Sequence, residues 1–190
     1  MNILAHFFLS GGNKSVIAGN FLADFLRGKQ IQKYSKLFKK GIDLHRAIDK
    51  FSDNHPNFKH SCRIIFPEYG HYSKVIIDVF YDHFLACNWD LYCKTPLHEY
   101  TKLFYDALLE NQEFFPEKAK KIAIKAIETK WLNNYESFER LNEVFTAFEK
   151  RLKFDNNIKN AIYSLKIHYN ELEKDFCFFF PEINRHIKQR

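Results

Sequence analysis

The chain has 190 residues, is 46% hydrophobic and 17% aromatic, and carries a formal net charge of +6. This length suits one domain with a sizeable core, and no apolar run approaches the ~20 residues of a membrane-spanning helix. The four cysteines form no CxxC pair, which argues against a disulfide scaffold and for a reduced, cytoplasmic protein. The first residues lack a basic segment and are interrupted by His6, which argues against a secretory signal.

A helical pattern runs through nearly the whole chain, and glycine and proline interrupt it at intervals. No alternating stretch is long enough to predict a strand. The sequence therefore predicts an all-α protein, a single-domain multi-helix bundle over residues 1–190. We expect helices near residues 15–27, 41–53, 57–66, 72–88, 96–112, 117–130, 134–152 and 156–176, followed by a short tail helix.

The first candidate site residues lie in the segments NILAH and GNFLADFLRG. His6, in the first segment, is a weak candidate by itself. In the second segment, Asn20 and Asp24 lie one turn apart among phenylalanine, leucine and alanine, so a helix places both on one face. Asn20 has an alternative interpretation as a hydrogen-bonding residue inside a helix, with no part in catalysis.

The segment GIDLHRAIDKFSDNHP, residues 41–56, carries a second pair. His45 and Asp49 are one helical turn apart, and isoleucines share their face, so the pair points toward the core. A lone histidine on an apolar face is more often a core residue than a ligand, but an aspartate one turn on makes His45 a ligand candidate. The guanidinium of Arg46 suits phosphate, with a salt bridge to Asp49 or Asp53 as the alternative.

VIIDVFYDHFLA, residues 75–86, carries a third pair, Asp78 and Asp82, followed by His83. Burying one unpaired carboxylate has an effective penalty of roughly several kcal/mol, so two on one apolar face need compensation. A structural role, such as capping another helix or pairing with arginine, is the alternative for either aspartate. A bound cation accounts for both together, because it removes their mutual repulsion.

Three segments that each carry a pair of oxygen or nitrogen ligands one turn apart predict a metal centre in a helical bundle. Carboxylates with histidines suit Mn²⁺, Mg²⁺, iron or Zn²⁺, and the lack of cysteine in the set argues against a structural zinc site. The sequence has no glycine-rich phosphate loop, GxSxG motif or HExxH motif.

In order along the chain, NILAH, GNFLADFLRG, GIDLHRAIDKFSDNHP and DVFYDHFL resemble the acyl carrier protein phosphodiesterases, also called holo-acyl-carrier-protein hydrolases. The resemblance implies an HD-domain-like all-α fold and a hydrolase of the phosphodiester that joins 4′-phosphopantetheine to a serine of acyl carrier protein. It also implies a divalent metal, with Mn²⁺ favoured and Mg²⁺ or Fe²⁺ as alternatives. The chain departs from the HD pattern because no histidine is followed directly by aspartate: Arg46 follows His45, and Asp82 precedes His83.

The residues above can serve this chemistry; the resemblance supplies their positions, and the roles that follow are our inference. A metal-bound water of lowered pKa attacks phosphorus, Arg46 neutralises the diester oxygens, and His83 or His6 gives the leaving alkoxide a proton. Metal ligands are predicted at Asp24, His45, Asp49, Asp78 and Asp82. Substrate or partner contacts are predicted at Asn20, Arg27, Lys36, Lys39 and Lys40.

The last four of these residues belong to RGKQIQKYSKLFKKG, residues 27–41, which we call the basic segment. The basic segment lies between two ligand-bearing segments, so we expect it near the mouth of the site. Carrier proteins of this type are acidic, and a basic rim would steer one toward the site. A solvated loop is the alternative. We expect no nucleic-acid partner and no membrane insertion, and the sequence leaves the oligomeric state open.

Two other functions stay open at this point. An HD-type phosphohydrolase acting on a nucleotide or another small phosphoester would share the metal and Arg46 but need no basic docking rim. A non-catalytic helical protein would bind RNA through the basic segment, where Tyr34 and Phe38 interleave with lysines. The metal content of the purified protein separates the RNA-binding protein from both enzymes.

Overall fold

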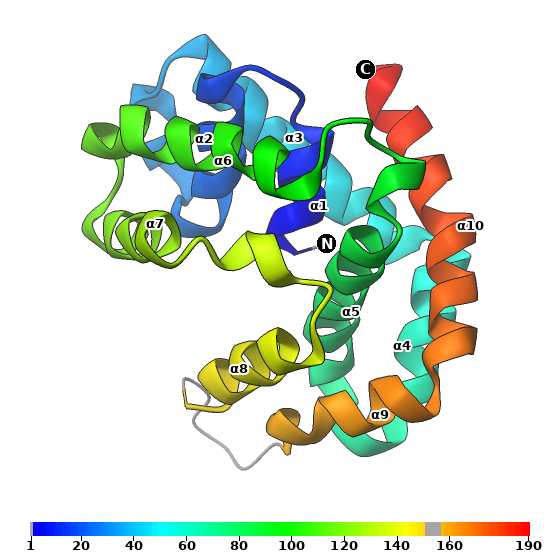
Figure 1. The fold of residues 1–190 in the computed structure, drawn as a ribbon. Helices are drawn as coiled ribbons and strands as arrows, with labels where there is room; N and C mark the ends of the chain where they lie inside the picture. The colour runs from blue at the N-terminus through cyan, green and yellow to red at the C-terminus, as the bar shows by residue number, and fades with distance from the viewer. Residues whose placement is uncertain (1, 151–156) are drawn as a thin grey trace. The chain divides into compact units, whose positions relative to one another are not determined.

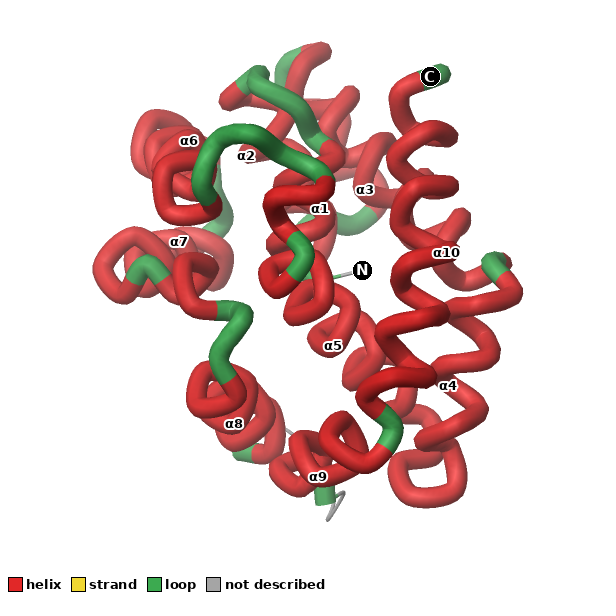
Figure 2. The backbone as a smooth tube through the Cα atoms, turned by 45° about the vertical axis from the view of Figure 1, so that its right-hand side comes forward, coloured by secondary structure: helices red, strands yellow, loops and turns green. Residues whose placement is uncertain are grey.

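The computed structural model of the protein describes residues 2–150 and 157–190. These residues form helices joined by short turns and contain no strand, so the all-α prediction is confirmed (Figure 2). The α-helices, labelled in Figure 1, are α1 Ile3–Leu9, α2 Lys14–Leu22, α3 Lys36–Asn54, α4 Pro56–Tyr69, α5 Ser73–Cys87, α6 Leu97–Asn111, α7 Glu117–Thr129, α8 Phe138–Glu149, α9 Ala161–Ile167 and α10 Tyr169–Lys188. Short 3₁₀ helices lie at Ala23–Phe25, Gly28–Lys33, Gly70–Tyr72, Trp89–Leu91, Gln112–Phe114, Trp131–Asn134 and Ile158–Asn160. None of the described helices is long and apolar enough to cross a membrane.

Several helix boundaries differ from those expected. α2 ends at Leu22, and the 3₁₀ turn that follows carries Asp24, so Asn20 and Asp24 do not share one regular α-helix. α3 begins at Lys36, five residues before the expected start at Gly41, so Gly41 lies inside the helix. The region expected to form one helix over 156–176 and a separate tail helix instead contains the short α9 and the long α10, which continues into the tail. The expected helix ends at 152 and 156 lie outside the described residues.

The chain divides into two compact units, each assembled from separate segments. The α2 unit contains residues 3–49 and 89–133, and the α5 unit contains residue 2, residues 50–88 and the described residues of 134–190. The division falls inside α3, so the last residues of that helix belong to the α5 unit. The predicted single domain over residues 1–190 stays a prediction.

α2 is the central helix of its unit. Every residue from Val16 to Leu22 is buried and all but Asn20 are apolar, as expected of a helix that neighbours cover on all sides. α2 packs against α1 and α6, and α6 packs against α7. Its first turn is capped by Asn13, whose side-chain oxygen accepts hydrogen bonds from the backbone N–H groups of Ser15 and Val16.

α2 and α3 approach each other until their backbones touch at two glycines. A Cβ atom added at Gly19 would lie 2.2 Å from the carbonyl oxygen of Phe38, and one at Gly41 would lie 2.1 Å from a carbonyl oxygen of α2. Glycine inside a helix costs about 1 kcal/mol relative to alanine, but here it permits an approach that any side chain would block. Asn20 follows Gly19 directly and His45 follows Gly41 by one turn, so the contact brings these two side chains together.

The α5 unit is built around α4, α5 and α10, which pack against one another, with α4 and α10 side by side in Figure 1. Its core is aromatic: the ring of Tyr81 meets Phe58 and Phe176 edge-on. Asp175 of α10 is buried and accepts a hydrogen bond from Ser61 of α4 at 2.8 Å. In the segment FCFFFPEI, residues 176–183 in the middle of α10, Phe176, Phe179, Phe180 and Ile183 are buried in this unit, whereas Cys177 and Phe178 are exposed.

The contact between the two glycines predicts the effect of Gly41→Ala. The added Cβ must push the α2 backbone away, so we expect a loss of about 1–3 kcal/mol in the free energy of unfolding, measured by urea denaturation. Gly12→Ala is the control, because a Cβ there meets nothing within 4 Å. Its effect should stay within about 0.5 kcal/mol. A Gly41→Ala protein as stable as wild type would show that α2 and α3 do not touch at this point.

Candidate metal centre

Two histidines and two aspartates converge in the α2 unit. His45 Nε2, on α3, lies 3.3 Å from Asp24 Oδ1 and 3.1 Å from Asp49 Oδ2. The other oxygen of Asp49 lies 3.2 Å from His6 Nε2, on α1. The two imidazole rings stack with their centroids 4.1 Å apart. We call His6, Asp24, His45 and Asp49 the His–Asp cluster.

The local sequence explains why this cluster has a buried side and an exposed side. His45 occupies a position on the buried stripe of α3, in line with the buried residues Ile42 and Ile48. Both imidazoles are buried, whereas the side chain of Asp49 is 47% exposed and that of Asp24 is 72% exposed. The histidines therefore form a buried floor, and the carboxylates form a rim that solvent reaches.

Asn20 lies beneath this floor. Its side chain is buried, and its Oδ1 lies 3.0 Å from His6 Nδ1 and 2.9 Å from His45 Nδ1. Its Nδ2 donates hydrogen bonds to the carbonyl oxygen of His6 and to Ser10 Oγ. The sequence suggested a contact with substrate or partner for Asn20, but the structure places its amide against the two imidazoles. Ser10 was not anticipated, since a lone serine beside glycines carries no recognisable signal.

The two histidines of the cluster differ in charge. Burial lowers the pKa of His6 to about 4, and the contact with Asp49 offsets this only in part. Burial also lowers the pKa of His45, but hydrogen bonds to Asp24 and Asp49 outweigh it and raise that pKa to about 9. For both aspartates, burial raises the pKa, yet hydrogen bonding, with His45 as the main partner, lowers it below the ordinary value. At neutral pH one cationic histidine thus faces two carboxylates, and the cluster is negative.

The donor atoms of the cluster suit a divalent cation. One ligand atom each from His6, His45 and Asp49 lie within 4.8 Å of one another. Ligands ~2.1 Å from one ion and at right angles are about 3.0 Å apart, close to the histidine–aspartate separations of 3.1–3.3 Å. His6 Nε2 is buried and makes no hydrogen bond within the described chain, so its lone pair is available to ligate a metal. Once His45 releases its proton, the two carboxylates balance a divalent charge. The nitrogen and oxygen donors suit Mn²⁺, Fe²⁺ or Zn²⁺.

Asp78 and Asp82, the other predicted ligands, lie on α5 in the α5 unit. Asp82 is fully buried and Asp78 is half-buried. After burial itself, the charge of Asp78 is the main cause that raises the pKa of the Cys62 thiol to about 12. Their membership of the metal centre stays a prediction.

His83, the predicted proton donor, is also buried on α5. Its Nδ1 donates a hydrogen bond to the carbonyl oxygen of Tyr135 at 2.9 Å, and its Nε2 lies 3.4 Å from the hydroxyl of Tyr169. Burial lowers the pKa of His83, so the imidazole is neutral at neutral pH. A neutral imidazole is a poor general acid, and the predicted catalytic role stays a prediction.

The predicted phosphate-binding and partner-binding cations lie mostly at the surface. Arg46 is exposed, and its guanidinium lies 3.7 Å from Asp43, one helical turn earlier. Within the basic segment, Lys39 is half-buried and its ammonium donates a hydrogen bond to the carbonyl oxygen of Gln32. The other predicted contacts of that segment are exposed: Arg27, Lys36 and Lys40.

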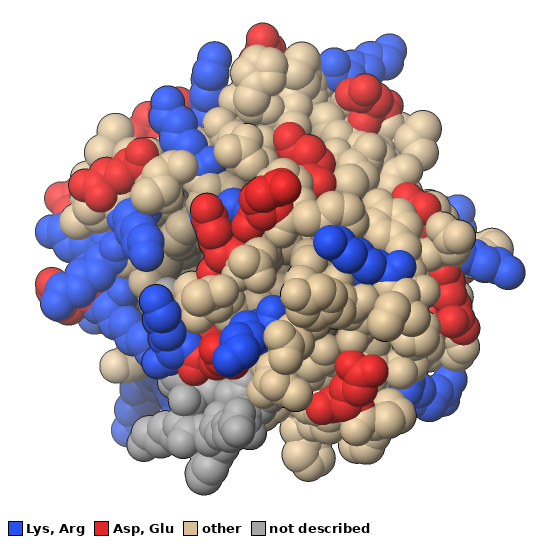
Figure 3. Space-filling view, turned by 60° about the horizontal axis from the view of Figure 1, so that its bottom comes forward, with Lys and Arg blue, Asp and Glu red and all other residues tan. Residues whose placement is uncertain are grey.

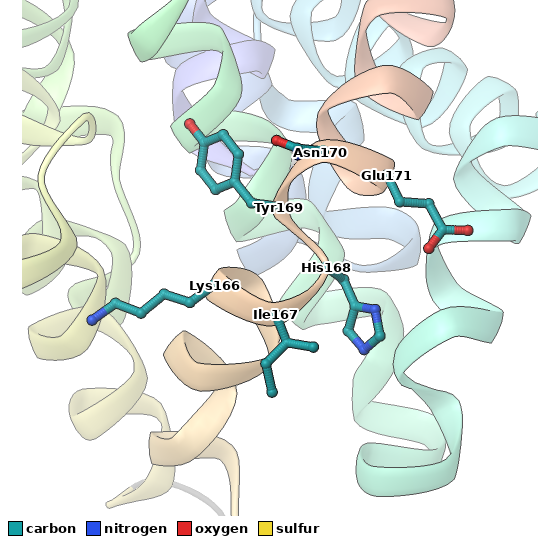
Figure 4. Close-up of a pocket in the computed structure, with 6 residues that line it drawn as sticks. All are labelled: Lys166, Ile167, His168, Tyr169, Asn170 and Glu171. Carbon is teal, nitrogen blue, oxygen red and sulfur yellow. The ribbon is translucent and has the colours of Figure 1, made fainter.

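A hollow of about 260 Å³ lies at the junction of α9 and α10 in the α5 unit. It is lined by six consecutive residues, 166–171, whose side chains diverge from the turn instead of converging on a point (Figure 4). Binding sites need a few convergent polar groups, and the His–Asp cluster has them where this hollow does not.

Comparisons with known proteins agree on one family. A family profile described as acyl carrier protein phosphodiesterase matches residues 1–183. Proteins named acyl carrier protein phosphodiesterase are similar over their full length: one from Enterobacter is 29% identical over 96% of this chain and 95% of its own, and one from Yersinia pestis is 28% identical over 100% and 99%. One from Serratia proteamaculans is 28% identical over 100% of this chain and 99% of its own. No solved structure matches the chain, so the predicted HD-like character stays a prediction.

The charges of the cluster predict two separate histidine titrations in protein freed of metal by chelator. NMR should show His45 titrating near pH 9 and His6 near pH 4, on either side of the ordinary value of about 6.5. Because the folded pKa of His45 is raised, its charge stabilises the fold below pH 6.5, and this stabilisation is lost as the pH rises toward 9. The stability difference between wild type and His45→Gln should therefore shrink across that range. An ordinary titration of His45 would mean that the aspartates do not contact it.

Proposed function

Because the chain belongs to the acyl carrier protein phosphodiesterase family, we propose that it hydrolyses the phosphodiester between 4′-phosphopantetheine and a serine of acyl carrier protein. The products are apo-carrier protein and free 4′-phosphopantetheine. We propose that the reaction needs a divalent metal, with Mn²⁺ favoured. The observation that supports this is the convergence of three ligand atoms, from His6, His45 and Asp49, within 4.8 Å of one another.

The residues of the cluster divide the work of holding a cation. A divalent cation at such a site polarises a phosphoryl oxygen and makes a water molecule more acidic. His6 and His45 present Nε2 from the buried floor, and Asp49 spans both with its two oxygens. The carboxylate of Asp24 is a second acidic contact of His45 Nε2. Because Asp24 and Asp49 are partly exposed, a phosphodiester at the surface of another protein reaches this side of the cluster.

Arg46 is suited to bind the substrate phosphate. It follows His45 directly on α3, so its backbone is held next to a residue of the cluster. Its contact with Asp43 is an exposed ion pair at 3.7 Å, which is worth little in water. A phosphate offers guanidinium two oxygens in a matching geometry and replaces such a contact readily.

The basic segment is suited to receive the carrier protein. It joins the turn that carries Asp24 to the helix that carries His45, and its exposed cations include Arg27, Lys36 and Lys40. On the face displayed in Figure 3, lysine and arginine side chains are densest on the left, with aspartate and glutamate side chains among them. A surface of one charge raises the rate of encounter with a partner of opposite charge, and this effect weakens with salt.

The activity itself is tested by incubating purified protein with Mn²⁺ and holo-carrier protein, and following loss of the prosthetic group by intact mass. Chelation should abolish the conversion, and His45→Gln and Asp49→Asn should lower kcat/KM by about 100-fold or more, because several kcal/mol of charge stabilisation is lost. His55→Gln is the control: it removes a buried histidine that contacts Glu182 in the α5 unit. Holo-carrier protein left intact under all conditions would contradict the proposed function.

The same assay decides whether the carboxylates of α5 belong to the centre. If Asp82 is a ligand, Asp82→Asn should lower activity by orders of magnitude, and chelator should lower the melting temperature of wild type much more than that of the variant. If Asp82 is a structural ion-pair partner, Asp82→Asn should cost about 3–5 kcal/mol of stability. Equal chelator shifts in both proteins would exclude Asp82 from the centre.

Docking on the basic segment predicts a change in binding without a change in chemistry. Lys36→Glu with Lys40→Glu should raise KM several-fold with little change in kcat, and should flatten the salt dependence of kcat/KM. Lys39 is left intact because it bonds the backbone of Gln32. Lys121→Glu with Lys125→Glu, two exposed lysines of α7, makes the same change in net charge elsewhere. Equal effects of the two pairs would remove the basic segment from the interface.

A further inference from the structure

The orientation of the Asn20 amide is determined by its neighbours. One end of the amide lies 3.2 Å from the carbonyl oxygen of His6, which only accepts hydrogen bonds, so that end is Nδ2. The same end lies 2.8 Å from Ser10 Oγ, whose proton is donated to the same carbonyl oxygen at 2.8 Å. Ser10 Oγ therefore accepts from Nδ2. The other end of the amide, facing both imidazoles, is Oδ1.

This orientation dictates where both imidazoles carry a proton. Asn20 Oδ1 is an acceptor only, and it lies within 3.0 Å of Nδ1 of both His6 and His45. Each Nδ1 must therefore donate. A neutral imidazole that is protonated at Nδ1 has its lone pair at Nε2, and both Nε2 atoms face the carboxylates.

The arrangement leaves a repulsive contact in the absence of a cation. His6 Nε2 and Asp49 Oδ1 are 3.2 Å apart, and with the proton of His6 held at Nδ1 both atoms direct lone pairs toward each other. No hydrogen bond within the described chain reaches His6 Nε2. A positive ion between the two atoms turns this repulsion into two attractions.

We infer that Asn20 is a positioning residue that holds His6 and His45 together in the Nδ1–H form, so that both Nε2 lone pairs are directed at one cation. We call this arrangement the Asn20 clamp. The inference rests on the proposed metal dependence, and it adds a residue that touches neither cation nor substrate. In metal sites the far N–H of a ligating histidine is usually held by an acceptor of this kind, and loss of that acceptor typically costs about 10–100-fold in affinity.

The first experiment reads the tautomers directly, in metal-free protein with ¹⁵N-labelled histidine near pH 7. Long-range ¹H–¹⁵N spectra should show His6 protonated at Nδ1 and unprotonated at Nε2. Asn20→Asp keeps an acceptor for both Nδ1–H groups and should keep this pattern. Asn20→Leu has a similar volume but no acceptor, and should release His6 to a mixture of tautomers. Wild-type His6 protonated at Nε2 would overturn the clamp, whether or not any variant folds.

The second experiment measures Mn²⁺ affinity by calorimetric titration of the same proteins. Asn20→Leu should bind Mn²⁺ about 10–100-fold more weakly than wild type, and Asn20→Asp should retain binding. Asn111→Leu is the matched control, because Asn111 is another buried asparagine of the α2 unit whose amide donates to its own helix at Ala107. Unchanged affinity in Asn20→Leu, or an equal loss in Asn111→Leu, would contradict the clamp.

Failure of the clamp and failure of the proposed function give different results. A wild-type protein that binds Mn²⁺ with the expected tautomers but leaves holo-carrier protein intact would end the proposed function and support the clamp. A protein that is active with Mn²⁺ while His6 is protonated at Nε2 would overturn the clamp and support the function.

Discussion

The contact between the backbones of α2 and α3 is the constraint on which the His–Asp cluster depends. Gly19 and Gly41 let the two helices approach more closely than any pair of side chains would allow. Asn20 and His45, the neighbours of this contact along their helices, are thereby held 2.9 Å apart. A wider crossing would separate the amide from the imidazole of His45 and leave the buried Nδ1–H of His45 without its acceptor, at a cost of about 1–3 kcal/mol. The close packing of α2 and α3 is thus required both by the fold of this unit and by the geometry of the His–Asp cluster.

The same closeness sets the electrostatics of the cluster. Burial beside α2 keeps His6 neutral, while the exposed carboxylates keep His45 charged. A buried pair of neutral histidines would bring no negative charge to balance a cation, and a pair of carboxylates in water would bind one weakly. Together they combine directed nitrogen lone pairs with negative charge on the solvent side. A partly buried cationic His45 is stabilised because the carboxylates of Asp24 and Asp49 both contact its Nε2.

Local patterns were sufficient to predict part of this site. His45 and Asp49 share one regular helix, so their spacing of one turn gave their contact directly. The place of Asp24 was harder, because α2 ends before it and only a 3₁₀ turn carries it to His45. The convergence of His6 depends on how α1 packs on α2, which no local spacing encodes. Gly41 was expected at a helix start, since a glycine required by close packing has the same local signal as one at a helix boundary.

The division between a buried floor and an open rim also fits the kind of substrate proposed. A phosphodiester attached to a folded carrier protein is not able to enter a deep pocket, so its phosphorus must meet the site at the surface. The exposed side of the cluster consists of Asp24 and Asp49, and the turn after Asp24 leads straight into the basic segment. A negative rim alone would repel an acidic protein. The neighbouring lysines and the charge of a bound cation together reverse that repulsion, so metal binding and partner binding would support each other.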